Sequence, residues 1–290
     1  MTGRSQTPSH EVIVALGDRR YRIDRPFGHW PDNTGKVSDV VVAQNGTILV
    51  LLRHDPYVDP DQPRVIVLSP DGDPVGAWGN TDIADAHLMT PAPDGRIFVV
   101  DRDMHEVVIF SPEGKRLGGI GTRGGPGQPF NHPTDIAFAP SGEFYVSDGY
   151  AGWHVHRFAA DGTHVRTWGT FGDGPGEFRE PHSLWCLPDG RVAVVDRCNH
   201  RVQHFDADGN YLSEWTGFRR PVGIWGDADG TVYVTDEVPS LHTFSLDGER
   251  IGRARPMLNG AHGLYGAPDG TLYLAEANPS RISRLLPVEH

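Results

Sequence analysis

Tight-turn dipeptides recur along the chain at intervals of 40 to 49 residues, and this internal repeat limits the fold more than any other feature. Each dipeptide joins Asn, Asp or Ser to Gly and is followed by a β-branched or aromatic run such as RIFVVD or TVYVTD. The six dipeptides are Asn45-Gly46, Asp94-Gly95, Ser141-Gly142, Asp189-Gly190, Asp229-Gly230 and Asp269-Gly270. Because such dipeptides favour two-residue hairpin turns, the series predicts six hairpins in six equivalent units.

A second series of turns alternates with the first. Its members usually follow alternating runs that end in Phe or Leu, as in EVVIFSPEG, a pattern typical of strands. They are Asp71-Gly72, Glu113-Gly114, Asp161-Gly162, Asp208-Gly209 and Asp247-Gly248. Four short strands per unit match one propeller blade, and no useful helical periodicity interrupts them. The sequence therefore predicts an all-β, six-bladed β-propeller and excludes an α/β fold.

The sixth unit reaches the C-terminus after SRISRLLPVEH and lacks an outer strand. The N-terminal run EVIVALGDRRYRID can supply that strand, which would close the ring by completing the last blade. Closure removes the open sheet edges that otherwise invite aggregation. No linker or change of composition divides the chain, so we expect one domain over residues 1–290, with an N-terminal tail of approximately residues 1–10.

Charge and cysteine content limit the surroundings of the protein. The chain carries 26 Lys and Arg against 38 Asp and Glu, a balance that argues against nucleic-acid binding. No apolar stretch is long enough for a secretory signal or a membrane span. Cys186 and Cys198 fit buried free thiols in a reducing compartment. We expect a cytoplasmic protein with a small-molecule substrate, no nucleic-acid partner and no membrane; the oligomeric state is left open.

Histidine occupies one repeat position in every second blade. Counting back seven residues from each first-series turn gives Ser38, His87, Thr134, His182, Val222 and His262. Alternate blades of a six-bladed ring are about 120° apart, and the first strand of each blade lines the channel. The three imidazoles should therefore converge on the axis, as in a catalytic zinc site with an open fourth position. The alternative is three unrelated channel-lining histidines bonded to water.

Two further residues are placed to act on a ligand at that centre. Arg53 and Tyr150 each follow a second strand, so both should lie in loops near the channel mouth. A guanidinium there could clamp a carboxylate, and a phenol near a dication could act as a general base. Arg102 and Arg197 share the repeat position of Arg53, which favours inter-blade ion pairs as the alternative interpretation.

Several phrases of the chain resemble NHL repeats. They include PGQPFNHPTDIAFAPSGEFYVSDGY and PGEFREPHSLWCLPDGRVAVVDRCNHRVQHF, which carry PGxF, PTDI or PHSL, and VVDRxNxRV in the expected order. The resemblance implies an NHL-type propeller. It does not identify the chemistry, because NHL propellers include enzymes, protein-binding modules and RNA-binding modules.

The His, Arg and Tyr set is similar to that of the peptidylglycine α-amidating lyase family, also called peptidyl-α-hydroxyglycine α-amidating lyase. The similarity rests on PTDIAFAPSGEFYVSDGY, on EPHSL followed by VVDR, and on AHGL. It implies zinc held by His87, His182 and His262. It also implies Tyr150 as the base and Arg53 as the group that holds a carboxylate. The family reaction cleaves an α-hydroxyglycine hemiaminal into a peptide amide and glyoxylate.

The chain also departs from that family. Gly263 stands where the family has the Asp of its structural calcium site, so structural Ca²⁺ is not expected. The sequence has neither a secretory signal nor a monooxygenase domain, and peptide amidation is not expected. We predict a lyase or hydratase that uses Zn²⁺, or another divalent transition metal, on a small hydroxylated or carbonyl compound. The reaction would be hemiaminal-type C–N cleavage or C–O addition or elimination of water.

Other interpretations remain open. The main alternative is a non-enzymatic NHL propeller that binds a protein or a small ligand through one face. A virginiamycin-type lyase is disfavoured because that fold has seven blades, whereas six turns are counted here. His54 and His132 lie near blade tips, where histidines are commonly solvated, although both could line the pocket.

Overall fold

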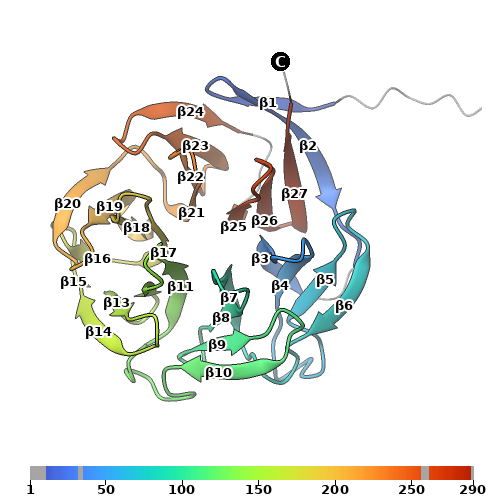
Figure 1. The fold of residues 1–290 in the computed structure, drawn as a ribbon, viewed down its shortest axis with the longest axis horizontal. Helices are drawn as coiled ribbons and strands as arrows, with labels where there is room; N and C mark the ends of the chain where they lie inside the picture. The colour runs from blue at the N-terminus through green and yellow to red at the C-terminus, as the bar shows by residue number, and fades with distance from the viewer. Residues whose placement is uncertain (1–10, 32–34, 256–260, 289–290) are drawn as a thin grey trace, which may run out of the picture.

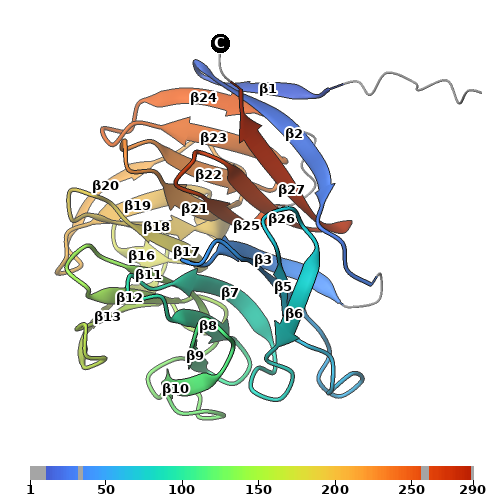
Figure 2. The same cartoon turned by 45° about the vertical axis from the view of Figure 1, so that its right-hand side comes forward.

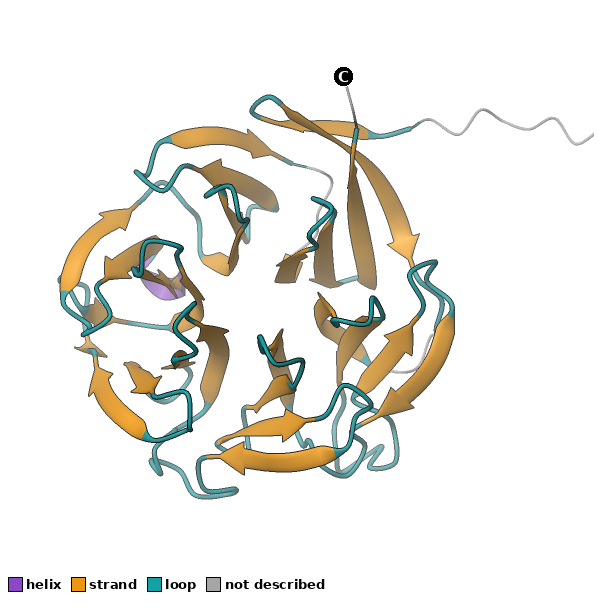
Figure 3. Cartoon of the chain, viewed as in Figure 1, coloured by secondary structure: helices purple, strands orange, loops and turns teal. Residues whose placement is uncertain are grey.

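The computed structural model describes residues 11–31, 35–255 and 261–288, and almost all of its regular structure is β-strand (Figure 3). Six antiparallel sheets surround a central axis like the blades of a propeller (Figure 1). Each first-series turn joins the inner two strands of a blade, and each second-series turn joins the outer two. The predicted six-bladed β-propeller is therefore confirmed.

The first three blades follow one another in chain order. Blade 1 comprises β3 (Lys36–Val42), β4 (Ile48–Arg53), β5 (Val65–Leu68) and β6 (Pro74–Trp78). Blade 2 comprises β7 (Ala86–Pro91), β8 (Ile97–Asp101), β9 (Glu106–Phe110) and β10 (Arg116–Ile120). Blade 3 comprises β11 (Pro133–Phe138), β12 (Phe144–Asp148), β13 (His154–Phe158) and β14 (His164–Trp168). In each blade the first strand lies innermost (Figure 1).

The other three blades continue the ring. A short parallel pair, β15 (Thr170–Phe171) and β16 (Glu177–Phe178), precedes blade 4. Blade 4 comprises β17 (Pro181–Cys186), β18 (Val192–Asp196), the 3-10 turn η1 (Arg197–Asn199), β19 (Arg201–Phe205) and β20 (Tyr211–Trp215). Blade 5 comprises β21 (Pro221–Gly226), β22 (Val232–Asp236), β23 (Ser240–Phe244) and β24 (Arg250–Ala254). Blade 6 comprises β25 (Ala261–Gly266), β26 (Leu272–Ala277), β27 (Ser280–Pro287), β2 (Arg19–Phe27) and β1 (Ile13–Leu16).

The N-terminal segment closes the ring, as the sequence predicts. Strand β2 pairs with β27 and becomes the fourth strand of blade 6, while β1 adds a fifth. The hairpin also reaches blade 5, because β1 lies beside β24 (Figures 1 and 2). The predicted tail of residues 1–10 lies outside the described residues.

A buried Asp at the end of the second strand anchors the segment that leads into the inner strand. In blades 2 to 5 its carboxylate accepts a hydrogen bond from the main-chain N–H 17 residues earlier in the chain. The four aspartates are Asp101, Asp148, Asp196 and Asp236. Each bond satisfies a main-chain donor that no sheet partner satisfies. The segments that lead into the inner strands are therefore tied to the ends of the second strands.

Apolar side chains fill the space between successive blades. One cluster joins Val41, Leu49 and Leu51 of blade 1 to Val99 and Val108 of blade 2. Packing of this kind removes both faces of the second strand of each blade from water, which explains the continuous apolar runs after the first-series turns. Among the described residues there is no helix with the length and apolar character needed to cross a bilayer.

We predict that Phe27→Ala weakens ring closure. Phe27 is 3% exposed, meets the Tyr273 ring edge to face at 5.9 Å and lies beneath the Arg284 guanidinium at 4.0 Å. Losing this packing should lower the free energy of unfolding by about 3–5 kcal/mol in urea denaturation. Val12→Ala, at a side chain 38% exposed, should change it by less than about 0.5 kcal/mol. Equal losses in both variants would contradict the role assigned to β2.

Candidate metal centre

A β-bulge lies at the same place in every inner strand. The pairing of the first and second strands shifts register there in all six blades. His87 falls within the shift between Ala86 and Met89, and His182 and His262 fall within the equivalent shifts of blades 4 and 6. A bulge bends the strand and redirects one side chain, so the repeat aims this position at the axis.

The three histidines meet as predicted. Their ring centroids are 5.0 Å apart for His87 and His182, 4.8 Å for His87 and His262, and 5.1 Å for His182 and His262. One ligand nitrogen from each lies within 4.8 Å of the others. His87 and His182 are fully buried, whereas His262 keeps some exposure. The spacing brings three imidazoles to one point on the axis.

Main-chain carbonyls orient all three rings. The Nδ1 atom of each histidine bonds the carbonyl of the next blade, which belongs to Thr134 for His87, Val222 for His182 and Ser38 for His262. These three acceptors occupy the same repeat position in the blades that lack histidine. A carbonyl only accepts, so each Nδ1 carries the proton and each Nε2 keeps its lone pair.

Burial keeps the histidines neutral. Desolvation lowers the pKa of His87 and His182 well below its usual value, and it lowers the pKa of His262 to about 4. Neighbouring positive charges lower these pKa values further. Neutral imidazoles with converging Nε2 lone pairs are the donor set that a divalent transition metal requires. The residues present therefore fit such an ion.

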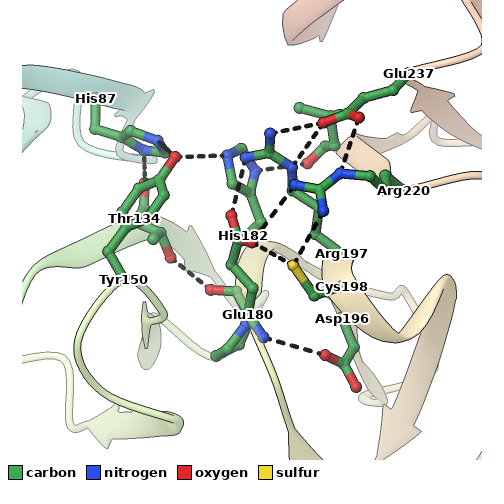
Figure 4. A network of polar contacts seen from close by, with 12 residues as sticks. His87, Thr134, Tyr150, Glu180, His182, Asp196, Arg197, Cys198, Arg220 and Glu237 are labelled. Carbon is green, nitrogen blue, oxygen red and sulfur yellow. Dashed lines mark hydrogen bonds and ion pairs between the residues drawn. The ribbon is translucent and has the colours of Figure 1, made fainter.

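Tyr150 lies directly against this centre (Figure 4). Its hydroxyl is 3.0 Å from Nε2 of His87 and 3.3 Å from Nε2 of His182. Both nitrogens are acceptors, so the single phenolic proton goes to one of them at a time. Burial raises the pKa of Tyr150, while the positive charges of Arg197, Arg53 and Arg102 act against this rise. The phenol is thus within proton-transfer reach of the histidine centre.

Arg53 lies at the same end of the ring but is already paired. Its Nε and Nη2 atoms donate to the two carboxylate oxygens of Asp85, each at 2.9 Å. Arg102 also contacts Asp85, at 2.7 Å, and its guanidinium stands 5.1 Å from the Tyr150 ring centroid. The structure therefore places Arg53 in the inter-blade ion pair that the sequence offered as the alternative. It also brings Arg102, which the sequence treated as structural, against the tyrosine.

Blade 4 repeats the pairing of an acidic residue with an arginine. Arg197 bonds Glu180 at 2.9 Å and Glu237 at 2.7 Å. Asp85 and Glu180 occupy the same repeat position, two residues before His87 and His182 (Figure 4 shows the blade 4 pair). Sequence reasoning missed both carboxylates, although this shared position was the signal that could have found them.

Cys186 is buried and free, as predicted. Cys198 is free but only half-buried, with its Sγ 2.6 Å from a carboxylate oxygen of Glu180 (Figure 4). The expectation of a buried thiol therefore holds for Cys186 alone. The position of Cys198 follows from η1, which presents this residue at the edge of the ion-pair network.

The two additional pocket candidates lie elsewhere. The His132 ring packs against His105 at 4.4 Å, and only its main-chain carbonyl contacts Tyr150. His54 lies beside Gly35, and burial lowers its pKa. Among the side chains that the structure describes, no hydrogen bond, ion pair or ring contact joins either residue to the three histidines.

Comparisons with known proteins agree with the repeat. The NHL repeat model matches residues 178–205. The chain is 31% identical over 229 residues to peptidyl-glycine alpha-amidating monooxygenase A of Xenopus laevis, covering 69% of this chain and 24% of that protein. It is 27% identical over 286 residues to the probable peptidyl-alpha-hydroxyglycine alpha-amidating lyase pgal-1 of Caenorhabditis elegans, covering 86% and 81% respectively. The chain thus spans about a quarter of the monooxygenase but most of the lyase.

Two further matches concern the repeat and the fold. NHL repeat-containing protein 3 of Mus musculus is 29% identical over 286 residues, which cover 92% of this chain and 76% of that protein. A streptogramin B lyase structure superposes with a TM-score of 0.68 over 95% of this chain and all of that chain. Its sequence identity is 13%, so this likeness concerns the fold alone.

We predict that Asp85→Asn destabilises the mouth of the ring. The substitution keeps the size of the side chain but removes the charge that two guanidinium groups share. The free energy of unfolding of the variant, measured by urea denaturation, should be about 1–3 kcal/mol lower than that of the wild type. Asp103→Asn, at a half-exposed partner of Arg102, should cost less than about 1 kcal/mol. An unchanged stability of Asp85→Asn would show that the shared ion pair contributes nothing.

Proposed function

We propose that this chain, an NHL-repeat β-propeller similar in sequence to the peptidyl-alpha-hydroxyglycine alpha-amidating lyases, is a metal-dependent lyase or hydratase. Its substrate would be a small hydroxylated or carbonyl compound. The observation that carries the proposal is the set of three Nδ1-anchored histidines, with a tyrosine hydroxyl on two of their free Nε2 atoms.

His87, His182 and His262 would hold the metal ion through Nε2. Imidazole ligands suit zinc and several other divalent transition metals, and zinc is our choice because three neutral histidines are typical of its catalytic sites. When bound, such an ion polarises a carbonyl or hydroxyl group and lowers the pKa of that hydroxyl. The carbonyl bonds at Nδ1 would keep the three rings oriented for it.

Tyr150 would move the proton. In hemiaminal cleavage the hydroxyl loses its proton, its oxygen becomes a carbonyl, the C–N bond breaks and the nitrogen takes up a proton. The hydroxyl lies within hydrogen-bond reach of the centre; ionised, with its own proton lost to solvent, it would accept the first proton and return one to the leaving nitrogen. In the addition of water to a carbonyl, the tyrosine would accept a proton from the water as its oxygen bonds to the carbonyl carbon, and would return a proton to the carbonyl oxygen.

Arg53 would orient an anionic or carbonyl group of the substrate. The Arg53 guanidinium is bonded to the Asp85 carboxylate, so a substrate carboxylate would have to displace Asp85 from it. Arg102 remains bonded to Asp85 and Asp103, which would steady the displaced carboxylate.

We also propose a single domain and a cytoplasmic location for the protein. All six blades contribute to one ring, which supports a single domain over residues 1–290. The two free cysteines support a cytoplasmic location. With that location, we propose a small metabolite as the substrate, with neither a nucleic acid nor a membrane as a partner.

The second candidate function is a non-enzymatic NHL propeller that binds a partner through one face. The similarity to NHL repeat-containing protein 3, which extends over 92% of this chain, favours it. In that case the histidines would pack in the channel without a metal ion. Metal stoichiometry distinguishes the two candidates.

We predict one metal ion per chain, lost in each of His87→Ala, His182→Ala and His262→Ala. Removing one of three ligands should lower metal affinity by orders of magnitude. Elemental analysis after chelation, reconstitution with zinc and desalting measures the content. His132→Ala, outside the centre, should retain the metal as the matched control. Full retention in all three ligand variants would exclude this metal site.

We predict that Tyr150→Phe loses activity but not metal. N-benzoyl-α-hydroxyglycine serves as the test substrate, with glyoxylate release as the signal. Loss of the proton-transfer group should lower kcat by about 10²–10⁴-fold. The zinc content should stay at one per chain, and Tyr57→Phe, at a fully exposed tyrosine, should match the wild type. An unchanged kcat for Tyr150→Phe would remove the tyrosine from the mechanism.

A further inference from the structure

A cavity of about 1310 Å³ opens along the axis on the face opposite Tyr150. Tyr150 follows the end of β12 that lies away from the first-series turn, whereas turn residues such as Gly46 and Gly270 line the cavity. All six blades contribute to its wall, and His262 lies among the lining residues. The histidine centre therefore has Tyr150 on one side and this cavity on the other.

Three aromatic side chains from neighbouring blades line the cavity next to one another. Trp185, Trp225 and Tyr265 occupy the same repeat position in blades 4, 5 and 6 and form what we call the aromatic belt. Ring centroids are 6.0 Å apart between the tryptophans and 6.5 Å apart between Trp225 and Tyr265. The Tyr265 hydroxyl continues the belt to blade 1 by donating to the Val42 carbonyl at 3.3 Å.

Glycines make room for this belt. A Cβ at Gly226 would lie 2.7 Å from Trp185 Nε1, and a Cβ at Gly266 would lie 2.2 Å from a ring carbon of Trp225. Each indole can therefore lie against the neighbouring blade only because that blade lacks a side chain there. The belt position in the other three blades holds small residues: Val41, Thr90 and Ala137. At this repeat position, aromatic residues are thus confined to blades 4, 5 and 6.

Two buried carboxyl groups line the same cavity nearer the histidines. Asp39 accepts hydrogen bonds from two main-chain N–H groups, and Asp135 accepts three, from Ile136 N, Ser183 Oγ and Leu184 N. Hydrogen bonds of this kind favour the ionised carboxylate, which has about four acceptor positions and keeps at least one free here. Gly263 leaves room for Asp39, since a Cβ there would lie 2.0 Å from Asp39 Oδ1.

Neither carboxylate has a cationic partner among the described side chains. Both are more than nine-tenths buried, and no ion pair includes either of them in the described part of the chain. Burial raises the pKa of Asp39 well above its usual value and that of Asp135 to about 7, because the hydrogen bonds only partly offset the cost of burying the charge. A cation in the cavity would supply the missing partner.

The rim of the cavity also carries more negative than positive side chains. Asp227, Asp229 and Asp269 line the outer part of the cavity, together with Arg19 and Arg20. Arg19 is already paired with Asp227, and it lies 3.6 Å from Asp229. The excess of carboxylates attracts cations and repels anions.

We propose that this cavity is a second binding site, which takes an organic cation with an aromatic or apolar body. Its ammonium group would bind Asp39 and Asp135, and its body would lie against the aromatic belt. Aromatic faces attract cations through the ring quadrupole, and partly exposed indoles offer the strongest such surface. The site does not depend on the reaction proposed for the opposite face.

Calorimetric titration of the whole chain tests this site with three matched probes. They are 2-phenylethylammonium, its neutral analogue 2-phenylethanol and its anionic analogue 3-phenylpropionate. The cation should bind at least tenfold more tightly than the alcohol, and the anion should not bind. Equal affinity for the cation and the alcohol, or no binding of the cation at millimolar concentration, would overturn the proposal.

Substitutions inside and outside the cavity test whether the cation binds there. Trp225→Leu should weaken binding of the cation at least fivefold, whereas Trp153→Leu, outside the cavity, should leave it unchanged. Asp135→Asn keeps an oxygen that can accept hydrogen bonds and a side chain of similar size. It should weaken binding of the cation but leave binding of the alcohol unchanged. If Trp225→Leu does not fold, the affinity of Asp135→Asn for the cation tests the site instead. Wild-type affinity in the folded variants would contradict the site.

Two metal-free samples, the protein after chelation and the variant His182→Ala, distinguish the cavity from the metal centre. Both should bind the cation as the wild type does, even if neither holds metal. Loss of binding in both would mean that the cation occupies the histidine centre instead, and would refute the second site. Failure of the metal predictions alone would leave this result intact.

Discussion

Three hydrogen bonds from histidine Nδ1 atoms to main-chain carbonyls hold the centre of the ring in place. Each bond crosses from a blade with histidine to the next blade without it, so donors and acceptors alternate around the axis. Strict alternation requires an even number of blades, and six blades give it threefold symmetry. The blade count, the bulge in every inner strand and the free Nε2 atoms thus depend on one another.

Charge near this centre is balanced by the residues just before two of the histidines. Arg53, Arg102 and Arg197 would otherwise place three positive charges beside a site suited to a metal cation. Asp85 and Glu180 pair with them and so reduce the repulsion that these charges would impose. The arginines still lower the pKa values of the buried histidines, which favours the neutral form that binds metal.

The sequence predicts features that repeat and depend on local geometry. The turn glycines, the closing strand and the three histidines have signals at fixed spacing, and the structure places all of them as expected. Contacts between blades are harder to predict, because the repeat shows which positions recur but not which two positions of neighbouring blades meet. The bidentate bond of Arg53 to Asp85, and the indole of Trp225 over Gly266, arise where neighbouring blades meet. Their partners lie 32 and 41 residues away in the sequence, in the neighbouring blade.

The histidine layer divides the channel into two chemically different halves. On one side a phenol and arginine–carboxylate pairs surround the centre, a setting that suits proton transfer and recognition of an anionic group. On the other side unpaired carboxylates and an aromatic belt create a negative, largely apolar cavity. One ligand with a single charge could not satisfy both settings. The ring therefore favours two ligands of opposite charge, separated by three imidazoles at van der Waals spacing.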